Sequence, residues 1–450
     1  MSVDVGRMSR RQMLQLAGLA AVGGLLVACQ PQVAEEAVPK EVDEPEPVGP
    51  AAGLTAGLEV WAYPYTENDL DIVWKPLIAK FNDTYPGIVI NMDVQPWGGR
   101  REKLYAAAAA GEPPDLWRGT SDTTPVYVEK GIIVDLTDLV PPEALEDFHE
   151  SEIAAGSYEG RYYMLMTSQQ IMGYGYNGRI MRELGYDDDA DPIVTWDGML
   201  DVAEQAKSLG YYLDQVSTIS WPQWIREIRQ AGGTTYAADR SRALMTEEPA
   251  VDLLTHWVRL FENEYVPLEG AVATDEGGVV ITNYFEADQQ AAMHTQLSGY
   301  CVTSEQDRPE LEFRMASPRQ RRSGDPLTAG NSSGDGFCIA KASKDLDACL
   351  LWGLFTIEPE NIGLFGTLSG TTPLGTKSLA YWETDPCTKA WVEQNAQYHF
   401  VNQDSTTLWQ ESKVVCGPHF QAAVLGQATV EQALEACEEE LNALLKEVYG

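Results

Sequence analysis

The spacing of apolar positions predicts an α/β body that starts near residue 58. Residues 58–63 alternate between apolar and polar side chains, as a half-buried strand does, and residues 88–94 repeat the pattern. Between them, residues 71–85 have helical spacing and end before a Pro-Gly pair. The next expected elements are a helix over 99–110 and strands over 115–117, 131–136, 161–176, 289–303 and 336–340. Alternating strands and helices predict a parallel sheet covered by helices.

Four later segments have the spacing of amphipathic helices. They are residues 196–209, 222–231, 247–264 and 430–448. The last of these places Leu434, Cys437 and Leu441 on one face, which is typical of a helix that packs against a core.

The N-terminus carries the pattern of an export signal. Arg10 and Arg11 precede an apolar run over 16–28, and these 13 residues are too few to cross a bilayer as a helix. We therefore predict a signal peptide over 1–28, whose paired arginines resemble a twin-arginine signal. The following Cys29 completes a sequence that resembles a lipobox, so we expect it to be lipidated; an incidental cysteine after an ordinary signal peptide is the alternative.

Residues 29–57 are expected to form a disordered tether. They are rich in Pro, Glu, Val and Ala and contain no aromatic residue, so they cannot form a core. The expected location is therefore outside the cytoplasmic membrane, with the body held to it by lipid.

The composition disfavours several classes of function. Thirty-one Lys and Arg against 68 Asp and Glu give a formal net charge of −37, which repels nucleic acid. The five histidines are scattered and no Cys-x-x-Cys pair occurs, so we expect no metal and no cofactor. No Walker A, H-E-x-x-H or G-x-S-x-G motif is present, so nothing in these residues supports an enzyme, although an enzyme stays possible at this point; the family resemblance described below implies none. Residues 173–178 match G-x-G-x-x-G, but the pattern contains bulky tyrosines and is interpreted as a turn or hinge.

Six cysteines follow Cys29, and an oxidising compartment makes disulfides plausible. They are Cys301, Cys338, Cys349, Cys387, Cys416 and Cys437. Six cysteines allow 15 pairings, and the sequence does not choose among them. The alternative is that several of these cysteines are buried free thiols.

Aromatic and polar residues lie in loops and at strand ends, where ligands bind in open α/β sheets. Flat rings cover the C–H faces of a sugar, and carboxylates and amides pair with its hydroxyls. The candidate ligand-binding residues are Tyr63, Trp97, Trp117, Asp122, Gln169, Trp221, Trp224, Tyr284, Asp335 and Trp409. For each single aromatic residue, core packing is the alternative.

Seven segments resemble, in order, landmarks of one family. They are residues 81–88, 103–115, 131–139, 220–222 with 230–233, 285–293, 334–339 with 372–374, and 426–434. The chain thus resembles the extracellular solute-binding proteins of ABC importers, in the sugar-binding group that includes maltose-binding protein.

The resemblance implies a periplasmic-binding-protein type II fold, in which a hinge joins two α/β lobes around an interlobe ligand cleft. We place lobe one at 58–168 plus 300–357 and lobe two at 169–299 plus 358–450, with crossings near 167–175, 297–300 and 357. The implied function is that of a monomer that captures a carbohydrate and delivers it to the ABC permease. The alternatives are another solute, such as a polyamine, an amino-acid derivative or glycerol phosphate, and an exported glycoside hydrolase.

Overall fold

The structure is a computed structural model. It describes residues 53–65, 68–169, 171–218, 220–272, 284–285, 289–297, 308–332, 334–395, 398–401 and 408–449. The predicted signal peptide, Cys29 and most of the predicted tether lie outside these residues. Within the described part, no helix has both the length and the apolar character needed to cross a bilayer.

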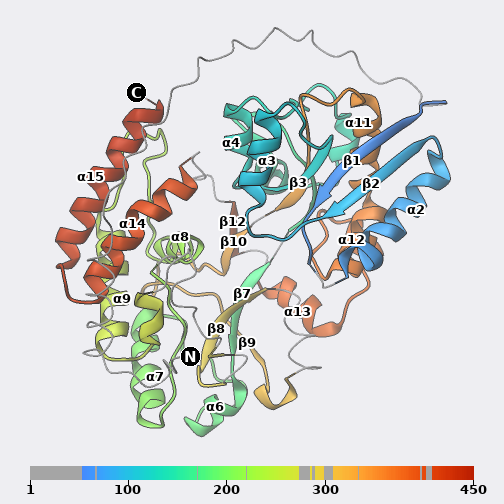
Figure 1. The fold of residues 1–450 in the computed structure, drawn as a ribbon. Helices are drawn as coiled ribbons and strands as arrows, with labels where there is room; N and C mark the ends of the chain where they lie inside the picture. Colours follow the sequence, from blue (N-terminus) through green and yellow to red (C-terminus); the bar gives the residue numbers. More distant parts are fainter. Residues whose placement is uncertain are drawn as a thin grey trace, which may run out of the picture. The chain divides into compact units, whose positions relative to one another are not determined.

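A five-stranded sheet organises the first of two hydrophobic cores. Its strand order is β2-β1-β3-β11-β6 (Figure 1). The strands are β1 Ala56–Ala62, β2 Ile88–Val94, β3 Leu116–Thr120, β6 Leu165–Ser168 and β11 Asp335–Ile339. In β1 the side chains of Leu58 and Val60 are buried, whereas that of Glu59 is exposed, so the alternation in the sequence matches one buried face.

The sheet is mixed rather than wholly parallel. β1 runs parallel to both β2 and β3, as predicted, but β11 runs antiparallel to β3 and to β6. Two other expectations were wrong: β1 begins at Ala56, inside the predicted tether, and residues 131–136 form only an isolated bridge, between Ile133 and Ala340.

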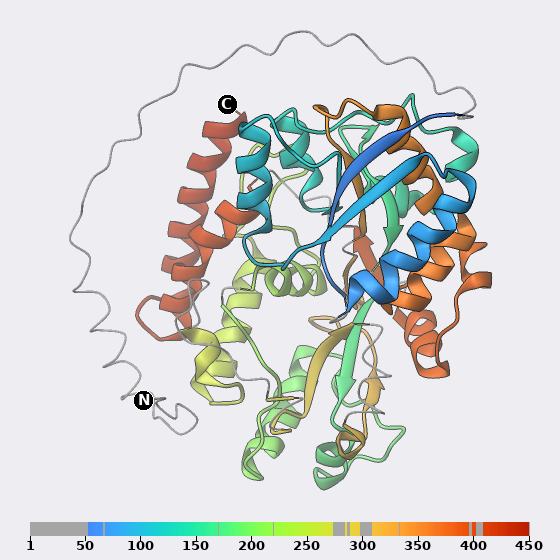
Figure 2. The same ribbon diagram turned by 45° about the vertical axis from the view of Figure 1, so that its right-hand side comes forward.

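Helices cover both sides of this sheet. α11 packs on β1, β6 and β11, and α12 packs on β6, whereas α3 and α4 lie on the other side in both views (Figures 1 and 2). The helices of this part of the chain are η1 Leu70–Trp74, α2 Lys75–Thr84, α3 Arg100–Ala109, α4 Thr124–Glu129, η2 Pro142–Leu145, α5 Glu150–Ala155, α11 Leu346–Thr356, α12 Pro359–Ser369 and η5 Ser378–Tyr381. The next helix, α13 Pro386–Asn395, contacts β7 instead.

The second core is mainly helical. Trp224 lies at its centre, with its ring stacked 4.3 Å from that of Phe420 and edge-on to Trp257. The helices are α6 Gly178–Glu183, α7 Trp196–Ser208, α8 Trp221–Gln230, α9 Glu248–Glu262, α14 Trp409–Val424 and α15 Val430–Tyr449. The four helices predicted from apolar spacing are therefore confirmed to within two residues at each end.

A three-stranded antiparallel sheet of order β8-β7-β9 completes this core. Its strands are β7 Met172–Tyr176, β8 Met293–Leu297 and β9 Arg314–Ala316, and the remaining elements are β4 Ser157–Tyr158, β5 Arg161–Tyr162, β10 Gly330–Ser332, β12 His399–Val401, η3 Leu268–Ala271 and η4 Pro309–Leu311. The turn expected at 173–178 is thus strand up to Tyr176. A Cβ atom on Gly173 would lie 2.7 Å from Trp391, and one on Gly175 would lie 2.2 Å from Phe313, so these glycines make room for aromatic rings.

The two cores divide the chain differently from the predicted lobe boundaries. Only residues 169–171 separate β6 in the first sheet from β7 in the second. β9 pairs with β7, and the buried residues of α12 belong to the first core. The chain therefore changes core between Ala316 and Asp335, and again after Leu374, rather than near residues 297–300 and 357.

Candidate ligand-binding site

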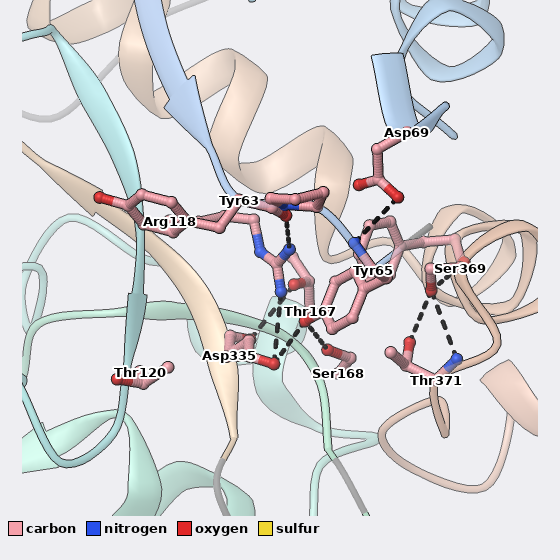
Figure 3. Close-up of polar contacts among 12 residues, drawn as sticks. Tyr63, Tyr65, Asp69, Arg118, Thr120, Thr167, Ser168, Asp335, Ser369 and Thr371 are labelled. Carbon is pink, nitrogen blue, oxygen red and sulfur yellow. Dashed lines mark hydrogen bonds and ion pairs between the residues drawn. The ribbon is translucent and has the colours of Figure 1, made fainter. Parts of the chain in front are cut away.

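Three strands of the first sheet bring polar side chains to one edge. β3 ends at Thr120 and β6 ends at Ser168, and Asp335 at the start of β11 pairs in register with both. Because β11 is antiparallel, its first residue lies beside the last residues of its neighbours. Tyr63 and Tyr65 follow the end of β1 at the same edge, as Figure 3 shows.

Arg118 is the buried cation of this edge. It lies in β3 with 1% of its surface exposed. Its Nη1 donates a hydrogen bond of 3.2 Å to the carbonyl oxygen of Tyr63, and its Nη2 lies 3.3 Å from Oδ2 of Asp335. The guanidinium carbon is 4.1 Å from the ring centre of Tyr65, whose hydroxyl donates to the same Asp335 oxygen. These contacts join the loop after β1 to β3 and β11 (Figure 3).

Burial dominates the electrostatics of the pair. It raises the pKa of Asp335 from 3.8 to about 6, although Arg118 acts in the opposite direction. Burial also lowers the pKa of Arg118 to about 10, although the attraction of Asp335 acts in the opposite direction. Both shifts favour the neutral forms, so the loss of hydration outweighs the mutual attraction.

Two aromatic rings lie next to this buried pair. The ring centres of Tyr63 and Trp97 are 5.3 Å apart, and the guanidinium carbon of Arg100 lies 4.5 Å from the ring centre of Trp97. The indole nitrogen of Trp97 donates to the carbonyl of Pro64 at 2.8 Å, which fixes the ring. We call Tyr63, Trp97 and Arg100 the aromatic platform. Trp97 is only partly buried, so part of the platform faces solvent.

Polar groups flank the platform. Asp122, two residues after β3, forms an ion pair of 2.7 Å with Arg101 at the start of α3. The hydroxyl oxygen of Thr120 is buried without a hydrogen-bond partner, so it has an unused donor and acceptor.

Gln169 extends the edge after β6. Its backbone pairs with Thr372, and its side-chain amide donates to Oε1 of Glu152. Burial raises the pKa of Glu152 despite several hydrogen bonds. Just before Thr372 in the chain, the hydroxyls of Ser369 and Thr371 lie 2.8 Å apart (Figure 3). Amide, hydroxyl and carboxylate groups thus line the edge next to exposed aromatic surface.

The structure brings five of the ten predicted site residues to this edge. These are Tyr63, Trp97, Asp122, Gln169 and Asp335. Trp117 and Trp224 have no exposed surface and lie inside the first and second cores. Trp221 is in the second core, and Tyr284 belongs to a small separate cluster beside Tyr212. The side chain of Trp409 lies outside the described residues.

Sequence reasoning missed Arg118, Tyr65 and Thr120. Arg118 did carry a signal, because a charged residue inside the apolar strand 116–120 must find a buried partner. Elsewhere, the described residues contain no cluster of His, Cys, Asp and Glu able to hold a metal ion.

The amino-acid sequence of the chain matches a known protein family. The chain belongs to the family of bacterial extracellular solute-binding proteins, whose model matches residues 76–397. The family is described as extracellular and solute-binding, so the protein is an exported binding protein. Its mixed α/β architecture is that of the periplasmic binding proteins.

Two curated proteins are similar in sequence to part of the chain. The maltotriose-binding protein of Pyrococcus abyssi is 26% identical over 185 residues, which are 40% of this chain and 36% of the relative. Diacetylchitobiose binding protein NgcE of Streptomyces coelicolor is 24% identical over 228 residues, or 47% of this chain and 46% of the relative. The chain thus spans less than half the length of these curated relatives.

Solved structures match over more of the chain. The cyclic alpha-maltosyl-1,6-maltose binding protein from Arthrobacter globiformis superposes with a TM-score of 0.73 at 21% identity, covering 87% of this chain and all of that one. The sugar-binding protein MalE from Xanthomonas citri gives a TM-score of 0.70 at 16% identity, covering 87% and 98%. At such identities, these likenesses establish the fold.

Proposed function

We propose that this protein captures a carbohydrate outside the cytoplasm and delivers it unchanged to the membrane subunits of an ABC importer. The aromatic platform beside the unpaired hydroxyl of Thr120 and the half-buried side chains of Asp122 and Gln169 is the observation that carries the proposal. A sugar has apolar C–H faces and a rim of hydroxyls, so a site for it needs flat rings and hydrogen-bonding side chains together. The maltotriose and diacetylchitobiose ligands of the two curated relatives support the same class of solute.

The contacts are proposed to come from both lobes. In the first, Tyr63 and Trp97 would stack on the sugar, and Asp122 and Gln169 would bind its hydroxyls. In the second, we propose Trp221, Tyr284 and Trp409. Asp335 is assigned a positioning role, since its carboxylate is already engaged by Arg118 and Tyr65. Trp117 and Trp224 are assigned to packing because they have no exposed surface.

Delivery is proposed to depend on closure of two halves. The short connection from β6 to β7 joins the two cores and suits a hinge, since few residues would need to change conformation. A sugar that contacts both halves stabilises the closed form over the open one. The closed form would then dock on the permease.

A thermal-shift screen tests the class of solute. Maltotriose or diacetylchitobiose is expected to raise the unfolding midpoint of the protein, whereas spermidine and glycerol phosphate are not, because only a ligand of the native state stabilises it. Trp97→Ala should weaken sugar binding roughly tenfold, by removing a ring contact of about 1.5 kcal/mol. Tyr381→Ala, at a ring 51% exposed on η5, is the matched control and should bind like the wild type.

Three results would contradict this reading. A shift caused only by spermidine or glycerol phosphate would indicate a solute other than a sugar. Cleaved oligosaccharide after incubation would indicate a glycoside hydrolase. Equal affinities of Trp97→Ala and Tyr381→Ala would remove the aromatic platform from the site.

The lipid anchor is proposed from the lipobox-like segment that ends at Cys29. Several acyl chains hold a protein stably on a membrane, so the wild type should sediment with membranes, and Cys29→Ala should leave it in the soluble fraction. Gln30→Ala, which keeps the cysteine, should still sediment. Wild-type protein found only in the soluble fraction would disprove lipidation.

A further inference from the structure

Two cysteines meet at the contact between the last two helices. Cys416 lies in α14 and Cys437 in α15, and both side chains are completely buried in the second core. The two helices pack side by side in both views (Figures 1 and 2), and a connection of five residues, 425–429, joins them. The Sγ atoms of Cys416 and Cys437 are 2.6 Å apart.

This separation is too short for two ordinary neighbouring side chains. Unbonded heavy atoms are most stable at roughly 3.5–4.0 Å, so the two sulfurs lie about 1 Å inside that range. The separation is only about 0.5 Å longer than a covalent S–S bond of ~2.05 Å. The packing of α15 on α14 thus already brings the two sulfur atoms close to bonding distance.

The other buried thiols of the described residues are placed differently. Cys338 is buried in β11 of the first core. Cys349 is buried in α11, and its sulfur lies 3.4 Å from the hydroxyl of Ser343. These two cysteines therefore serve as internal references for thiols that stay free in the same protein.

We propose that Cys416 and Cys437 form a disulfide bond in the exported protein. The reaction is a thiol–disulfide exchange with an oxidised disulfide carrier outside the cytoplasm. The two thiols lose two electrons and two protons and become joined, and the disulfide of the carrier is reduced to a dithiol. Because burial raises the pKa of Cys416 and removes access, the exchange takes place before α14 and α15 pack or while they are transiently apart.

The bond would fasten the C-terminal helix to the second core. α15 already packs on α14 and α9, and Asn442 and Glu438 accept hydrogen bonds from the backbone N–H groups of Ala243 and Thr246. A covalent link from α15 to α14 closes the loop between residues 416 and 437 and reduces the freedom of the unfolded chain. This inference does not depend on the identity of the solute.

Differential alkylation of the exported wild-type protein tests the bond. The protein is denatured without reductant, treated with iodoacetamide, digested and analysed by mass spectrometry. We expect Cys338 and Cys349 to be alkylated, and Cys416 and Cys437 to appear as one linked peptide pair that separates on reduction. Alkylation of Cys416 and Cys437 to the same extent as the two references, or a link from either to another cysteine, overturns the proposal.

Thermal unfolding gives a second test. Cys387 is also disulfide-bonded, so a reductant acts on more than one bond, and comparison of variants is needed. Reduction should lower the unfolding midpoint of the wild type more than that of Cys416→Ala/Cys437→Ala. It should lower the midpoint of Cys338→Ala/Cys349→Ala as much as that of the wild type. Equal falls in the wild type and in the Cys416/Cys437 variant overturn the proposal. If that variant does not fold, the alkylation pattern of the wild type still decides.

Discussion

Replacing Arg118 by methionine is expected to lower the free energy of unfolding by about 3–5 kcal/mol, because it leaves the carboxylate of Asp335 buried without a counter-charge. Arg118 is almost fully buried, lies 3.3 Å from Asp335, and donates to the carbonyl of Tyr63. Methionine has a similar length, so the loss comes from charge and hydrogen bonding rather than from a large cavity. Denaturant unfolding at neutral pH measures the difference.

The ion pair between Arg101 and Asp122 supplies a matched control. It is shorter, at 2.7 Å, but its side chains are 23% and 17% exposed, so water solvates the partner that remains. Arg101→Met should therefore cost about 1 kcal/mol or less. In the double variant Arg118→Met/Asp335→Asn, the free energy of unfolding should fall by less than the sum of the two single decreases, because no unpaired charge remains. If Arg118→Met and Arg101→Met lower the free energy of unfolding equally, the buried pair of Arg118 and Asp335 does not stabilise the fold as argued.

The stability contribution of Asp335 is expected to decrease as the pH rises from 4 to 7. Its pKa is raised by burial from 3.8 to about 6 in the folded protein, so over this interval the folded state holds a proton that the unfolded state has lost. A group of this kind contributes most below its unfolded pKa, and the contribution disappears as the pH passes the folded pKa. A rise in the pKa from 3.8 to about 6 corresponds to a stability contribution of at most about 3 kcal/mol.

The measurement is a difference between two proteins. Unfolding free energies of the wild type and of Asp335→Asn are compared at several pH values, which cancels the titration of the other carboxylates. The wild type should lose stability relative to the variant between pH 4 and 7. Asp325→Asn is the control of opposite sign, because a hydrogen bond from Arg321 lowers the pKa of Asp325, so that its contribution is lost as the pH falls. A difference for Asp335→Asn that stays constant with pH would show that its pKa is not raised.

These two predictions concern support of the site rather than direct contact with a solute. Arg118 and Asp335 hold the loop that follows β1, and this loop carries Tyr63 and accepts the hydrogen bond from Trp97 through Pro64. A satisfied buried network makes such a loop rigid, which reduces the entropy lost when a ligand binds. Arg118→Met is therefore expected to disturb the aromatic platform as well as the fold.

The sequence predicted the elements of the fold better than their arrangement. The ends of helices such as α9 and α15 were predicted to within two residues. Over a segment of this length, apolar residues that recur every three or four positions fit the period of a helix and not that of a strand. The sheet was expected to be parallel because neighbouring strands and helices alternate. Local patterns carry no information on which distant strand joins a sheet, so the antiparallel β11, more than 200 residues after β3, was not foreseen.

Because local patterns say nothing about long-range packing, only some of the candidate site residues lie at the edge of the sheet. Tyr63, Trp97 and Asp122 lie near the ends of early strands and the start of α3, so local patterns were enough to predict that they lie near one edge of the sheet. Trp117 and Trp224 have the same residue type but lie inside the cores, because the burial of a tryptophan depends on what packs around it.

By itself, the sequence determined the family and the positions of the long amphipathic helices, because both follow from local patterns of residues. The tertiary structure alone decided that Asp335 meets Arg118 and that Cys416 meets Cys437. Each pair joins residues that are separate along the chain, and only the packing of whole strands and helices sets the distance between them.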